Sequence, residues 1–151
     1  MKVLPFFLFA FLLLQACKPN SATESGATSS ETQGDQSMEN KVMAIHDEVM
    51  PKMKDINDLS AQLRTVRQNL KEGEDGKLIT PVGLDDAMSS LKLADQAMWD
   101  WMKAYGDTKA TLPADQLNSF YEKELEKITK VKEDMLAAIS KASAWLEAYP
   151  K

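Results

Sequence analysis

Apolar residues recur at alternating spacings of four and three from Met38 to Leu70, and Lys52 is the one interruption. This spacing keeps one face of an α-helix apolar and is typical of coiled-coil packing when sustained over several heptads. Ser37 stands before the run as a helix N-cap. We therefore predict a first helix over about residues 38–72. Its predicted core positions are Met38, Val42, Ile45, Val49, Ile56, Leu59, Leu63, Val66 and Leu70.

Two later segments carry the same helical period. Thr80 and Pro81 have the residue types of an N-cap and a first helical turn, and Gly106 provides a stop, which predicts a second helix over about residues 81–106. A third helix is predicted over about residues 113–149. The predicted core of the second helix is Leu84, Ala87, Leu91, Ala94, Met98, Trp101 and Tyr105. That of the third is Leu117, Tyr121, Leu125, Ile128, Val131, Met135, Ala138, Ile139, Ala142, Trp145 and Leu146.

The connections between these helices are short, which makes consecutive helices antiparallel neighbours. No segment of residues 38–150 has the two-residue period of a strand. The predicted fold class is therefore all-α, an up-down-up antiparallel three-helix bundle with coiled-coil-like packing on a disordered tether. Pro51 lies inside the first helix and has no N–H to donate to the carbonyl of Asp47, so we expect a bend that wraps this helix around its neighbours.

The start of the chain has the pattern of an export signal. Lys2 is followed by an apolar run over residues 3–14, which is shorter than the roughly 20 residues of a membrane-spanning helix. The run ends in Leu14-Gln15-Ala16-Cys17, which resembles the lipobox of bacterial lipoproteins. The resemblance implies cleavage after residue 16 and a covalent lipid on Cys17. An uncleaved signal anchor with a chance cysteine is the alternative interpretation.

Small and polar residues fill the segment between Cys17 and the bundle, and they bury too little surface to offset the entropy of ordering. The sequence thus predicts a signal peptide over 1–16, an acylated cysteine with a disordered linker over 17–37, and a bundle over 38–150. The chain holds 18 basic and 23 acidic residues, for a net charge of −5, and loss of Lys2 with the signal makes it −6. This charge argues against nucleic acid as a partner and leaves membrane attachment to the lipid anchor.

Methionine, histidine and tryptophan gather at one end of the predicted bundle. A second row beside the first core stripe starts with Met43, His46, Met50 and Met53. Antiparallel pairing brings this row level with the stretch Met98-Trp99-Asp100-Trp101-Met102 and with Phe120 and Tyr121.

Three interpretations of this end remain open. It is a soft core, because methionine fills irregular gaps and packs well on aromatic rings. Alternatively it is a surface for a partner protein, with Met50, Met53, Trp99 and Met102 as the candidate contacts. The third possibility is a ligand site, in which His46 with Met43 and Met50 binds Cu(I) or a haem iron. Spacings of three and four on one helix face suit such chelation but also occur on any apolar face.

Catalytic chemistry has little support in the sequence. The chain has one histidine, its one cysteine is expected to carry lipid, and no glycine-rich phosphate loop is present. The carboxylates fall on outward helix faces. We therefore expect a protein that is not an enzyme.

The strings Met43-Ala-Ile-His-Asp-Glu-Val-Met-Pro-Lys-Met53 and Met98-Trp-Asp-Trp-Met102, behind a lipobox, resemble small helical lipoproteins of Bacteroidota that are often labelled "viral A-type inclusion protein". The resemblance implies a helical fold and an outer-membrane address, and it supplies no catalytic residues. Surface-displayed lipoproteins of that group commonly have acidic residues just after the cysteine. Here Lys18-Pro19-Asn20 follows it, so the resemblance favours a periplasmic orientation. The expected function is a non-catalytic interaction or accessory module for an envelope protein partner, with Cu(I) or haem binding as the alternative.

Overall fold

The structure is a computed structural model that describes the backbone of residues 29–77 and 79–149, with side chains from residue 37 onward. Cys17 and the predicted signal peptide lie outside the described residues. The helices are α1 (Ser29–Val49), α2 (Lys52–Gln68), α3 (Leu84–Lys109) and α4 (Leu117–Ala148). A single 3₁₀ turn, η1 (Ala114–Gln116), precedes α4.

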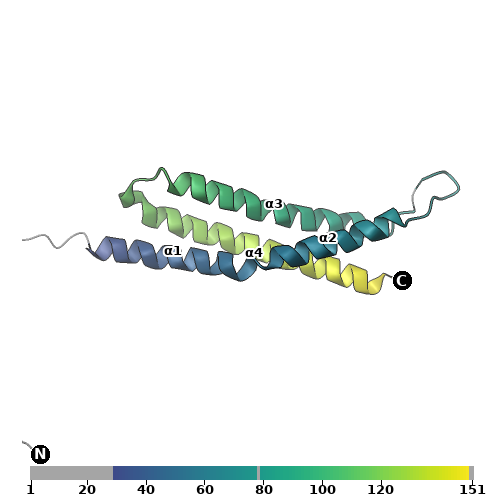
Figure 1. The fold of residues 1–151 in the computed structure, drawn as a ribbon, viewed down its shortest axis with the longest axis horizontal. Coiled ribbons are helices and arrows are strands. Elements are labelled where there is room, and N and C mark those ends of the chain that lie inside the picture. Colours follow the sequence, from purple (N-terminus) through teal and green to yellow (C-terminus); the bar gives the residue numbers. More distant parts are fainter. Residues whose placement is uncertain (1–28, 78, 150–151) are drawn as a thin grey trace, which may run out of the picture.

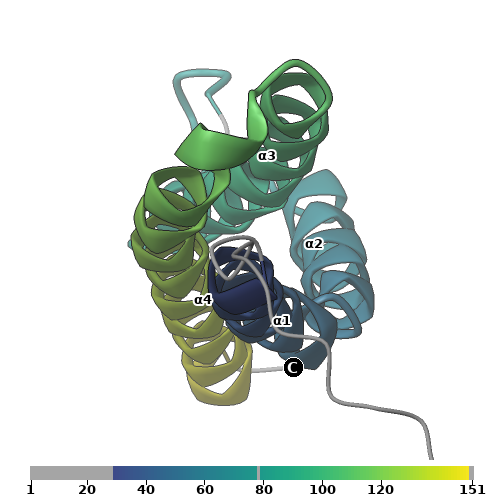
Figure 2. The same cartoon turned by 90° about the vertical axis from the view of Figure 1, so that its left-hand side faces the viewer.

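The helices form an elongated antiparallel bundle (Figure 1). α1 and α2 follow each other in one direction, α3 returns, and α4 runs in the direction of α1. The predicted all-α fold, with three helical segments packed against one another in up-down-up order, is confirmed. α4 contacts α1, α2 and α3, and the end view shows α4 and α2 on either side of α1 with α3 above them (Figure 2). Of the helices in the described part of the chain, none is both long enough and apolar enough to cross a membrane.

The first predicted helix is divided at Pro51 into α1 and α2. The Met50 N–H still donates to the His46 carbonyl at 2.8 Å, whereas Met53 donates to the carbonyl of Met50, three residues back, at 3.1 Å. Pro51 itself has no N–H for the ladder, so the expected bend occurs as a break between two helices. Because of it, α1 packs mainly on α4, and α2 packs on both α3 and α4.

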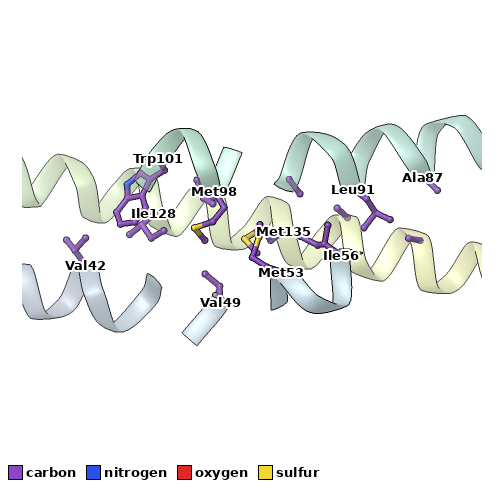
Figure 3. Packing of buried hydrophobic residues seen from close by; sticks show 14 of the residues in the cluster. Val42, Val49, Met53, Ile56, Ala87, Leu91, Met98, Trp101, Ile128 and Met135 are labelled. Carbon is purple, nitrogen blue, oxygen red and sulfur yellow. The ribbon is translucent and has the colours of Figure 1, made fainter. Parts of the chain in front are cut away.

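The core follows the predicted stripes with one change near the break. Val49 and Ile56 are buried as predicted, but Met53 from the second row is buried between them at 7 % exposure, and Lys52 is exposed. Met53, Met98 and Met135 meet there from three different helices (Figure 3). Flexible thioether side chains suit this place because a helix break leaves an irregular space to fill.

Both ends of the second helix differ from the predicted ones. α3 begins at Leu84 rather than at residue 81, because Gly83 has a φ of +84° and Leu84 N–H donates to the Pro81 carbonyl at 3.2 Å in a turn. Positive φ at Gly83 cannot continue a helix, and glycine adopts it without a Cβ clash. α3 also passes through Gly106 to Lys109, since a glycine inside a helix weakens it without ending it.

α1 also begins earlier than predicted, at Ser29 instead of residue 38. The end of the expected linker segment therefore has a helical backbone from Ser29 onward. Residues 17–28 of that segment lie outside the described residues.

Trp145, near the end of α4, holds the connection that leads into α3. Its indole Nε1 donates to the Val82 carbonyl at 2.9 Å, and its ring stacks on Tyr149 with centroids 4.9 Å apart. A Cβ on Gly83 would lie 3.1 Å from the Trp145 ring, so glycine also allows this close approach. The last turns of α4 thus fix the start of α3.

We expect Met135→Ala to lower the free energy of unfolding by about 2–5 kcal/mol, because it empties a fully buried position in the core. Leu136→Ala is the matched control, since the neighbouring side chain is 40 % exposed and should lose under about 1 kcal/mol. Urea unfolding followed by circular dichroism measures both. Equal losses in the two variants would contradict the packing described.

Candidate functional site

Five rings from three helices form a continuous row at the end of the bundle where α1 begins. His46 of α1 packs on Trp101 of α3 with centroids 5.7 Å apart, and Trp101 stacks on Tyr105 at 5.1 Å. Tyr105 contacts Phe120 at 5.5 Å, and Phe120 contacts Tyr121 at 5.5 Å. The expected convergence of the histidine, a tryptophan and the first aromatic residues of α4 is therefore observed.

Glu39 joins the three helices at the same end, and sequence reasoning missed it. Its carboxylate accepts hydrogen bonds from Tyr121 Oη at 3.0 Å and Tyr105 Oη at 3.3 Å, and it also pairs with Lys109 Nζ. The Lys109 ammonium lies 5.8 Å from the centre of the Tyr105 ring and 6.0 Å from that of Tyr121, within the range of cation–π attraction. A single acidic residue on α1 is thus bonded to α3 and α4 together.

The environment of this cluster fixes its protonation. The hydrogen bond from Lys109 lowers the pKa of Glu39, and the bonds from Tyr121 and Tyr105 add to this effect against partial burial, which raises it. Burial and the nearby Glu39 charge raise the pKa of Tyr105 far above its usual range. At neutral pH Glu39 is therefore an anion that accepts from a neutral Tyr105 phenol, which suits a structural clamp better than proton transfer.

His46, the central residue of the metal hypothesis, is mostly buried at the edge of this row. Its Nδ1 lies 2.8 Å from Asp47 Oδ1, and one ring face packs on Trp101. Met43 and Met50 are partly buried on the same helix. Within residues 37–77 and 79–149, no group of three or more His, Cys, Asp or Glu side chains is placed to hold a metal ion. The geometry is that of an imidazole hydrogen-bonded to a carboxylate and tilted against an indole.

The four candidate partner contacts divide between core and surface. Met53 belongs to the core, which corrects its assignment to a surface, because the break at Pro51 turns it inward. Trp99 is 56 % exposed, and Met102, one turn further along α3, is partly buried. Met50, which follows α1, is also partly buried. Trp99 and Met102, one turn apart on α3, define what we call the Trp99 surface.

Two buried polar atoms in this half of the bundle have no hydrogen-bond partner in the part of the chain described: Trp101 Nε1 and Glu124 Oε2. Glu124 is only 4 % exposed, and its other oxygen accepts from Lys127 Nζ at 2.7 Å. Most buried polar atoms in proteins are paired. The aromatic end therefore keeps one donor and one acceptor uncommitted, in addition to its apolar rings.

Comparison of the chain with protein-family models, with curated proteins and with solved structures gives no match.

We expect Glu39→Gln to lower the free energy of unfolding by about 1–2 kcal/mol at pH 7, because it removes the charge that three donors stabilise. The lowered pKa means that this stabilisation is complete above the ordinary value of 4.5 and is lost as the pH falls through the lowered value. The free energies of unfolding of the native chain and of the Glu39→Gln variant should therefore become equal in acid, when unfolding is measured across this range. Glu126→Gln, at an exposed position of α4, should show no such convergence.

Proposed function

We propose that this chain is a lipid-anchored protein of the bacterial outer membrane, facing the periplasm, whose helical bundle is a non-catalytic binding module for an envelope protein. The lipobox ending in Cys17 and the resemblance to small helical lipoproteins support the anchor and the address. A two- or three-chain lipid anchor would hold the bundle near the membrane without any apolar helix across it.

The exposure of Trp99 is the observation that carries the binding proposal. Trp101 is buried among the rings, and Trp145 is partly buried and hydrogen-bonded, but Trp99 presents more than half of its surface to solvent. An exposed indole loses water-contact area on binding, and tryptophan is enriched among the residues that contribute most to protein interfaces.

The surroundings of Trp99 suit a protein partner. Met102 supplies adaptable thioether surface one turn along α3 from the indole, and methionine packs favourably on aromatic groups. Asp100 and Lys103 are exposed on the same stretch of α3 and provide charged positions at the rim. An apolar centre with a polar rim is the usual composition of a protein interface. The expected partner therefore presents an apolar pocket or groove with polar edges.

Cys17→Ser should abolish attachment to the membrane through lipid, because the sulfur that carries the diacylglycerol is lost. Metabolic labelling with a fatty acid, followed by fractionation, tests this: the native chain should be labelled and sedimented, and the variant should be unlabelled and uncleaved. Label in the serine variant would refute the anchor while leaving the bundle proposal intact.

Trp99→Ala should lower the free energy of unfolding by less than about 1 kcal/mol, because more than half of the ring is already exposed. In contrast, it should reduce co-purification of the partner at least ten-fold, the loss expected from a central interface tryptophan. Quantitative mass spectrometry of the acylated protein purified from its own membranes measures the second effect.

A photo-crosslinking residue at position 99 tests the surface directly. It should trap one discrete envelope protein, whereas the same residue at Glu133, an exposed position of α4, should not. Crosslinking at Glu133 but not at position 99 would place the interface elsewhere and contradict the proposal.

A further inference from the structure

A groove between α2 and α3 has a chemistry unlike that of the Trp99 surface. It has a volume of about 380 Å³, which is in the range of sites for small molecules. Residues one and two turns apart on facing helices line it, namely Ser60, Arg64 and Arg67 from α2, and Asp85, Met88, Ser89 and Lys92 from α3. The spacing places each set on a single helix face, so the groove is built by regular secondary structure.

Positive charge dominates the groove in a chain of net negative charge. Three cationic side chains and one carboxylate leave a local charge of about +2. Arg67 Nη1 donates to Asp85 Oδ1 at 2.7 Å, and this ion pair links α2 to α3 at one side of the groove. Arg67 Nη1 also lies 3.9 Å from Met88 Sδ, so the thioether contributes to the wall.

The other donors of the groove are uncommitted. Arg64 and Lys92 have no hydrogen bond or ion pair with any residue that the structure describes, and the hydroxyls of Ser60 and Ser89 have no hydrogen-bond partner there either. A guanidinium, an ammonium and two hydroxyls therefore stand around one volume, each free to donate to a ligand oxygen.

We propose that the α2–α3 groove binds the phosphoryl group of a small phosphomonoester. A phosphomonoester carries a charge of about −1.5 to −2 at pH 7, which matches the local charge. Its three acceptor oxygens can serve all four donor groups, because each oxygen accepts more than one hydrogen bond. A carboxylate offers one charge and two oxygens, and would leave a cation unmatched. Arg64 supplies the planar fork that phosphate oxygens accept in pairs, and Lys92 supplies a point charge.

The size and lining of the groove argue for an organic body on the phosphoryl group. Met88 and the apolar stems of Arg64 and Lys92 form much of the wall, and such surface is covered by carbon better than by water. The phosphomonoester has two chemical sources, a water-soluble metabolite or the headgroup of a phosphatidic acid. Both present the same terminal group to the four donors.

Titration calorimetry of the acylated chain in detergent tests the proposal with four probes: glycerol 3-phosphate, dihexanoyl phosphatidic acid, inorganic phosphate and glutarate. Binding of either ester with a Kd below about 1 mM supports the site. A preference for glycerol 3-phosphate assigns the metabolite source, and a preference for the short-chain lipid assigns the headgroup. Tighter binding of glutarate, equal binding of inorganic phosphate, or no binding of either ester would overturn the proposal.

Arg64→Gln and Lys92→Gln should each weaken ester binding at least ten-fold, because each removes a charged donor. The matched controls are Lys54→Gln on α2 and Lys130→Gln on α4, exposed lysines outside the groove, which should leave the affinity unchanged. Circular dichroism confirms that each variant is folded. Binding that survives in both groove variants, or is lost equally in the controls, would refute this location.

Discussion

The arrangement of the bundle depends on the missing backbone N–H at Pro51. Without it the first helical segment ends at Val49 and starts again at Lys52, so the chain changes direction while its apolar stripe continues. α1 is then free to lie on α4, and α2 packs against α3 as well. An unbroken helix would have to follow one neighbour along its whole length. The proline therefore divides the bundle into two halves with different cross-sections.

The two halves differ in the side chains that lie between their helices. Where α1 lies on α4, aromatic rings fill the space between three helices, and Glu39 ties them together through two phenols and an ammonium. Where α2 lies beside α3, the core is also filled, and long cationic side chains border a groove beside it. Lys92 and Trp99 are seven residues apart on α3, about 10 Å along the helix. Both proposed binding surfaces thus include residues of α3.

The helices and most of the core could be predicted because burial on one face imposes a three-and-four spacing that a sequence records directly. That Met53 and not Lys52 occupies the next core position could not be predicted, because it depends on the direction that the chain takes after the break at Pro51. The role of Glu39 was missed because an acidic residue near the start of a predicted helix is usually exposed to solvent. Its three hydrogen-bond donors also lie 66 to 82 positions away in the sequence. Trp99 lay off the core stripe, so its exposure was foreseeable, whereas a groove formed by two helices requires their relative position.

The hydrogen bond from Trp145 to the Val82 carbonyl has a consequence for the order in which the molecule assembles. During synthesis the chain grows from its N-terminus, so the connection before α3 is complete some 60 residues before the indole that holds it is made. The connection between α2 and α3 therefore lacks this hydrogen bond until the last turns of α4 have been synthesised and have packed against it. A chain that lacks only the final turns of α4 would keep its other helices but lose the Trp145 hydrogen bond. Its connection before α3 should then be the first site of proteolytic cleavage.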